Sequence, residues 1–79
     1  MDNIFAKSTD EPVVDLLCIG ADNTPNGYNG TLSCVMTYHD QSGYNRHRYS
    51  QSYVAGPDFD EYTRSYEYGS GWTGWELVE

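Results

Sequence analysis

The sequence predicts a small α+β domain in which one helix packs on a face of an antiparallel sheet of three to four strands. Three observations lead to this class: polar and apolar residues alternate over residues 31–54, aromatic residues recur at helical spacing over residues 57–67, and the 79-residue length suits a single domain, 1–79. A chain of this length buries only about 60–65% of the surface that its unfolded form exposes. Core and binding surface must therefore share residues.

The first third of the chain predicts an arm, a strand and a turn region. Residues 1–12 are expected to form a flexible arm, because the polar run that ends at Pro12 interrupts any regular element. Residues 13–19 are apolar and partly β-branched, which favours a short strand. Residues 20–30 hold two Asn-Gly pairs, at Asn26 and at Asn29, and either pair is compatible with a type I′ turn.

The middle of the chain predicts a β-hairpin. Residues 31–39 and 44–54 alternate between polar and large side chains, and residues 40–43 supply the loop. A loop of two or four residues places the large side chains of both strands on one face of the sheet, whereas a three-residue loop turns one strand over. The shared face then holds Leu32, Cys34, Met36 and Tyr38 from the first strand and His47, Tyr49, Gln51 and Tyr53 from the second.

The segment from Pro57 to Glu67 predicts the helix. Pro57 suits the first turn, Asp58 and Glu61 have capping-box spacing, and Gly69 follows the expected end. The spacing of three aromatic residues would place them on one stripe facing the sheet, namely Phe59, Tyr62 and Tyr66.

Residues 72–78 predict a closing strand. In a regular strand Trp72 and Trp75 project to opposite faces, so that one indole joins the core and the other is exposed. An exposed indole is typical of a binding hot spot, and a ring that caps the helix end is the structural alternative.

The formal net charge of −8, from twelve acidic and four basic residues, excludes an ordinary nucleic-acid binder. Such a protein neutralises phosphates with lysine and arginine, and binding to an anionic membrane is disfavoured for the same reason. The charge favours basic protein partners, and it also keeps a small protein in solution.

The sequence gives little support for catalysis, and we predict that the chain is not an enzyme and uses no cofactor. His39 and His47 lie on the two arms of the hairpin beside Asp40, but no third ligand follows at a metal-binding spacing. Asp58 and Asp60 lack the oxygen-ligand pattern of a calcium loop, and the sequence has no phosphate-binding glycine loop. We therefore predict neither a catalytic nor a metal site.

The cysteines and the beginning of the chain predict an intracellular protein. Residues 1–7 lack the basic opening and long apolar stretch of a signal peptide. Cys18 and Cys34 form no metal-binding or redox motif, so we expect two buried free thiols, with a disulfide as the alternative.

Three acids within four residues mark the candidate binding site. Carboxylates at a helix start are stabilising in their own right, but Asp58, Asp60 and Glu61 exceed what a cap requires. With Glu67, Glu76 and Glu79 they would form an anionic face interleaved with tyrosine hydroxyls. We predict that this face binds the partner, with Tyr62, Glu67 and Trp72 as anchors.

The size, charge and acidic segment of this chain resemble those of the small anti-CRISPR proteins that phages encode. The resemblance covers the whole chain as a type: under a hundred residues, strongly acidic, rich in aromatic residues, with an acidic helix such as residues 58–67. It implies a non-enzymatic inhibitor that binds a CRISPR effector subunit in the cytoplasm of an infected bacterium and blocks target DNA sterically. An anionic face steered onto a DNA-binding groove is consistent with that mechanism.

Two other functions fit the composition. A glycan-binding or phage structural module would use exposed tyrosine and tryptophan together with the loop of residues 23–30. A small oligomerising subunit would pair the edge of its final strand with a second copy.

Overall fold

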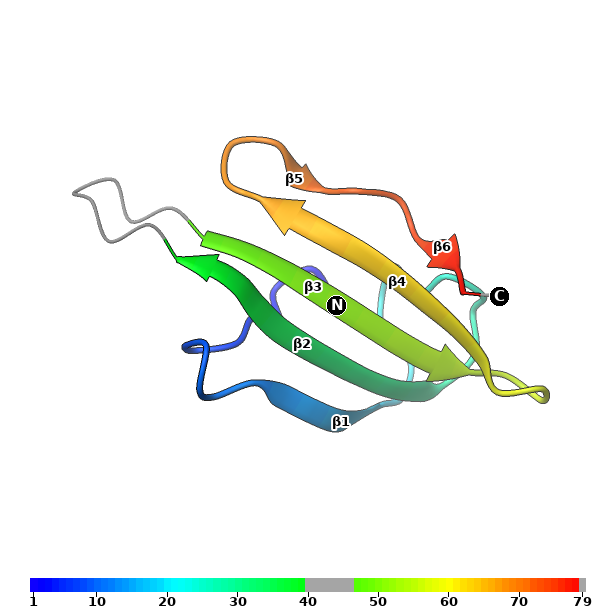
Figure 1. Cartoon of the computed structure of the whole chain (residues 1–79). Helices are drawn as coiled ribbons and strands as arrows, with labels where there is room; N and C mark the ends of the chain where they lie inside the picture. Colours follow the sequence, from blue (N-terminus) through cyan, green and yellow to red (C-terminus); the bar gives the residue numbers. More distant parts are fainter. Residues whose placement is uncertain (40–46, 79) are drawn as a thin grey trace.

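The computed structural model describes residues 1–39 and 47–78 of the chain. Within these ranges the backbone forms six strands and no helix, so the predicted α+β class is wrong. All pairs are antiparallel, in one sheet of order β1-β2-β3-β4-β5, and β6 also pairs with β4 (Figure 1). The strands are β1 (Val13–Cys18), β2 (Gly30–His39), β3 (His47–Ala55), β4 (Asp60–Glu67), β5 (Gly71–Trp72) and β6 (Glu76–Leu77).

The segment predicted as a helix forms a turn followed by β4. The signals assigned to a helix start serve the turn instead: the Phe59 amide donates to the Gly56 carbonyl at 3.1 Å. This bond places Pro57 at the second turn position, where the fixed φ of proline is favoured. The turn joins β3 to β4 directly after the pair Ala55–Asp60.

The sequence of β4 fits both the period of a helix and the period of a strand, and its pairing with neighbouring strands selects the strand. Aromatic residues follow helical spacing, but Tyr62, Arg64 and Tyr66 also alternate with smaller or acidic residues, and tyrosine and threonine favour strands. A helix of about ten residues is marginal in water. As a strand the segment pairs with β3 on one side and with β5 and β6 on the other.

The hairpin of β2 and β3 confirms the predicted sharing of one face. Directly opposite pairs include Leu32–Tyr53, Cys34–Gln51 and Met36–Tyr49. An irregularity between Met36 and Tyr38 then shifts the register. Because of it Tyr38 pairs with Arg48 and lies on the opposite face, contrary to the prediction. The predicted hairpin loop at residues 40–43, and the start of the second arm at residues 44–46, lie outside the described residues.

The sheet has a covered face and an open face. The covered face carries the core, in which Leu32, Cys34, Gln51, Tyr53 and Arg64 are buried. On the open face, as the strand pairs define it, lie smaller and polar side chains: Thr31, Ser33 and Val35 of β2, Ser50, Ser52 and Val54 of β3, and Glu61, Thr63, Ser65 and Glu67 of β4. Alternation between the two faces is typical of an antiparallel sheet with one solvated side.

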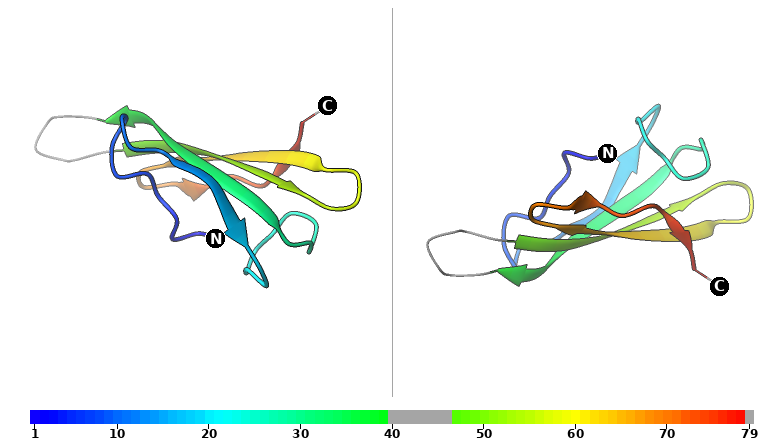
Figure 2. Two further views of the ribbon diagram at one scale, coloured as in Figure 1. Left: turned by 90° about the horizontal axis from the view of Figure 1, so that it is seen from below. Right: turned by 90° about the horizontal axis from the view of Figure 1, so that it is seen from above.

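The N-terminal segment lies against the covered face, in the region that the sequence predicted as a flexible arm. Ala6 is buried, and Met1 and Ile4 pack against the core. The Phe5 ring contacts the rings of Tyr49, Tyr66 and Trp72, with centroids 4.8, 5.3 and 5.6 Å away. In both views of Figure 2 this segment lies on one side of the sheet, and no described segment covers the other side.

Buried Gln51 connects the N-terminal segment to the sheet. Its Nε2 donates to the carbonyls of Met1 and Ile4, at 3.3 and 2.9 Å, and its Oε1 accepts from Arg64 Nε at 2.8 Å. A buried amide group is costly unless its polar atoms are hydrogen-bonded, and these three bonds involve both the nitrogen and the oxygen of the Gln51 amide.

The predicted closing strand is split into β5 and β6, and residues 73–75 between them belong to no strand, although the Thr73 amide donates to the Ser65 carbonyl of β4 at 2.8 Å. Cys18 and Cys34 are buried free thiols, as predicted. In the part of the chain that the model describes, no helix has the length and apolar character needed to cross a membrane.

Candidate functional site

The predicted site residues do not form one patch. Asp58 lies in the turn after Gly56, and four of the others lie on β4, where successive side chains alternate between faces. Glu61 and Glu67 are on the open face, whereas Asp60 and Tyr62 are on the side of the covered face. The predicted anionic helix surface is therefore wrong in its geometry.

Extension of the chain also separates the acids along the sheet. Glu61 and Glu67 are six residues apart, which is roughly 20 Å in a strand and about 9 Å in a helix. Asp58, Asp60 and Glu61 lie at the turn that joins β3 to β4, where Asp60 and Glu61 project to opposite faces of the sheet. Glu67 is separated from them, at the far end of β4.

Two of the predicted anchors have partners within the chain. Glu67 accepts a charged hydrogen bond from Arg48 at 3.0 Å, and both side chains are 58% exposed. Tyr62 is half-buried between its strand neighbours, Tyr53 on β3 and Leu77 on β6. An exposed ion pair of this kind contributes about 0–1 kcal/mol.

The third anchor, Trp72, is half-buried and is held by contacts within the chain. Its indole Nε1 donates to the Asp2 carbonyl at 3.1 Å, and its ring stacks on Phe5. The Trp75 Nε1 donates to the Asn23 carbonyl at 2.9 Å. Both indoles lie against Arg64, so the prediction that they project to opposite faces is wrong.

Arg64 is the residue whose role the sequence analysis missed. Its guanidinium carbon lies 4.2 Å from the Trp72 ring centroid and 4.4 Å from that of Trp75. Its Nη1 pairs with Asp2 Oδ1 at 2.8 Å, and its side chain is only 1% exposed. Its Nη2 is buried with no protein hydrogen-bond partner. The alternation of Tyr62, Arg64 and Tyr66, read as a strand, would have placed Arg64 on the same face as the two tyrosines.

The electrostatics of the covered face hold its carboxylate charged and its thiol and hydroxyls neutral. Hydrogen bonds from Asn23 and then Arg64 lower the pKa of Asp2. Burial raises the pKa of Cys34, and burial likewise raises the pKa of Tyr49 and Tyr53. At neutral pH the Asp2 carboxylate is therefore charged, and the Cys34 thiol and the two tyrosine hydroxyls are protonated.

The two histidines stack on each other at one end of the hairpin. The rings of His39 and His47 have centroids 4.4 Å apart and planes 15° from parallel. In residues 1–39 and 47–78 no group of three or more histidine, cysteine or acidic side chains is arranged to hold a metal ion. Asp40, which the sequence analysis placed beside them, lies outside the described residues.

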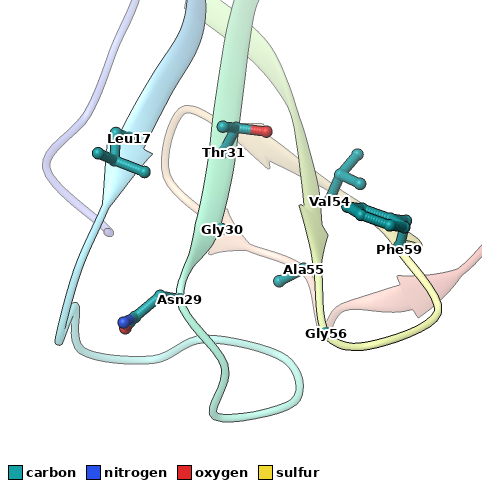
Figure 3. A pocket seen from close by; sticks show the side chains of 8 residues that line it. All are labelled: Leu17, Asn29, Gly30, Thr31, Val54, Ala55, Gly56 and Phe59. Atoms are coloured by element: carbon teal, nitrogen blue, oxygen red, sulfur yellow. The ribbon is translucent and has the colours of Figure 1, made fainter.

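The acidic turn lies next to a shallow apolar hollow that the sequence did not predict. The hollow has a volume of about 230 Å³, and its lining includes Leu17, Thr31, Val54 and Phe59 (Figure 3). Phe59, assigned to the buried stripe of the predicted helix, is 79% exposed in the turn. The run Gly-Pro-Asp between two alternating segments was the sequence signal for that turn.

Comparisons of this chain with protein-family models, with curated proteins and with solved structures found no match.

Proposed function

We propose that this chain is a non-enzymatic inhibitor of the anti-CRISPR type, which binds the basic DNA-binding surface of a CRISPR effector in the cytoplasm of an infected bacterium. The observation that carries the proposal is the acidic turn, defined as Asp58, Asp60 and Glu61, whose side chains are exposed at one end of the sheet. Lysine-rich grooves that bind DNA attract such a surface and are occluded by it.

The distribution of positive charge supports this end of the molecule as the binding surface. Among the described residues, Arg48 pairs with Glu67 and Arg64 pairs with Asp2, so two of the four bases are engaged within the chain. No described base forms an ion pair with the acidic turn. Within the described residues, no ion pair neutralises the negative charge of this turn.

A fourth acid, which the sequence already assigned to the anionic face, extends the surface, whereas Glu79 lies outside the described residues. Glu76 on β6 is directly opposite Thr63 and lies diagonally across from Glu61 on the open face. Diagonal neighbours in a sheet are about 7–8 Å apart, which is close to the spacing of successive phosphates. The proposed contact set is thus the acidic turn with Glu76, while Tyr62, Glu67 and Trp72 act within the fold.

Displacement of DNA tests this function directly. Purified CRISPR effector complexes are incubated with labelled target DNA, with and without this protein, and the shift of the DNA is measured on native gels. We expect one effector to lose its DNA at protein concentrations near stoichiometry. Intact DNA binding across the panel would contradict the proposal.

The glycan-binding alternative loses part of its support in this fold. It requires an exposed tryptophan, and both indole nitrogens donate to backbone carbonyls of the same chain. Tyr28 is exposed, but one ring does not form a stacking platform of the expected kind. Binding on a glycan array together with intact DNA shifts would favour that alternative.

A further inference from the structure

The turn between β3 and β4 exposes a phenylalanine on a backbone conformation that rarely accommodates one. Phe59 has a φ of +53°, in the left-handed region that glycine and asparagine favour. The residue is 79% exposed, so burial in this chain does not compensate for the conformation. Neither the turn nor the core of this chain accounts for an aromatic residue at this position.

The hollow beside Phe59 is largely apolar and lies on the open face of the sheet. Leu17 pairs with Thr31, and Thr31 pairs with Val54, so three strands present adjacent side chains there. Figure 3 shows the Phe59 ring beside Val54, with Leu17 on the other side of the hollow. Leu17 is 65% exposed, which leaves this wall accessible to a partner.

Acidic residues lie on one side of this apolar hollow. Asp58 precedes Phe59 in the turn, and Glu61 is directly opposite Val54 on the open face, whereas Asp60 lies on the side of the covered face. We propose that the hollow binds a protein segment that presents one large apolar side chain flanked by lysine or arginine. The proposal rests on the proposed function and specifies what the basic partner must insert beside the acidic turn.

Charge complementarity selects this occupant over a second copy of the chain. Two copies joined through this end would bring two acidic turns together, and like charges oppose such an interface. A partner with an apolar side chain between basic residues would fill the hollow and pair with the acidic turn at the same time. Protein interfaces commonly combine a central apolar anchor with polar contacts around it.

Titration with three capped peptides tests the site by NMR on the ¹⁵N-labelled protein. The first peptide has a central leucine flanked on each side by two lysines, the second has serine in place of leucine, and the third has glutamates in place of the lysines. We expect the first to shift the amide resonances of Thr31, Val54 and Phe59, the second to bind roughly tenfold more weakly, and the third not to bind.

Phe59→Gly provides a variant that removes the ring without straining the turn. Glycine favours a positive φ, so we expect the variant to unfold at the same or a higher denaturant concentration than the wild type. Phe59→Asn serves the same purpose with a second residue that tolerates this conformation. Both variants should bind the leucine peptide at least roughly tenfold more weakly.

Several results would overturn the proposal. They are absence of shifts with the leucine peptide, equal binding of the serine peptide, and unchanged binding by both Phe59 variants. Shifts of the same amides on concentrating the protein alone would identify a second copy as the occupant. The two proposals fail separately: leucine-dependent binding without DNA displacement contradicts the inhibitor function, and DNA displacement that Phe59→Gly leaves unchanged contradicts the hollow.

Discussion

At the scale of single residues, Arg64 explains how so small a chain orders its covered face. A buried cation is expensive unless it is paired and hydrogen-bonded. Here Asp2, Gln51 and two indole faces surround one guanidinium. The same group therefore connects the N-terminal segment to β3, β4 and the chain beyond β5.

Arg64→Met should destabilise the protein by about 2–3 kcal/mol, because it removes the charged bonds to Asp2 and Gln51 and the contacts with both indoles. Arg48→Met is the matched control, since it breaks the other arginine–carboxylate pair, whose side chains are 58% exposed. The control should cost about 0–1 kcal/mol. Urea unfolding followed by tryptophan fluorescence measures both, and equal losses would contradict the account of Arg64.

At the scale of elements, the hairpin was predictable from the sequence and β4 was not. The residues of β2 and β3 alternate with a period of two, which fits a strand, and only one register places the large side chains of both strands on the same face. The strand pairs Leu32–Tyr53 and Cys34–Gln51 confirm this register. Residues 57–67 satisfy both a helical and a strand period, and the helix-start signals also describe a turn. Hydrogen bonding to β3, β5 and β6 selects the strand over the helix. These partners are distant in sequence, so residues 57–67 alone do not reveal them.

The candidate site was predictable only in part for the same reason. Asp58, Asp60 and Glu61 remain neighbours along the chain in either conformation, although in the strand Asp60 and Glu61 project to opposite faces. Glu67 and Trp72 required the helix for their proposed roles, and the extended chain removes both from the acidic turn. The exposed position of Phe59 depends on a backbone angle that residue type alone disfavours.

The start of β2 provides a test of strand packing. A Cβ added at Gly30 would lie within 3 Å of the Val54 carbonyl and the Ala55 Cβ, and a backbone atom cannot move aside cheaply. We expect Gly30→Ala to destabilise the protein by about 1–3 kcal/mol. Gly74→Ala is the control, because no atom lies within 4 Å of its added Cβ.

Thermal unfolding of both glycine variants measures this difference. The Gly74 variant should remain within about 0.5 kcal/mol of the wild type. A Gly30→Ala variant as stable as the wild type would show that β2 and β3 do not approach as closely as the structure places them.

At the scale of the whole molecule, covering one face of the sheet leaves the other face for binding. The N-terminal segment and the tryptophans complete the core on one side, and the acidic turn and the hollow occupy one end of the sheet. The chain devotes two arginines to internal pairs. Three of its twelve acidic residues lie in the acidic turn, where no described base pairs with them.

The most direct test of the acidic turn compares two variants with equal net charge. Asp60→Lys/Glu61→Lys reverses the turn, and Asp10→Lys/Glu11→Lys reverses an Asp-Glu pair that precedes β1. All four side chains are exposed, so both variants should fold. The measurement is displacement of target DNA from the CRISPR effector that the wild type inhibits.

We predict that reversal at residues 60 and 61 raises the concentration needed for displacement at least roughly tenfold, and that reversal at residues 10 and 11 leaves it within about threefold of the wild type. Equal loss in both variants would show that overall charge, rather than the acidic turn, drives binding. Full activity in both variants, or no displacement by the wild type from any effector, would contradict the account.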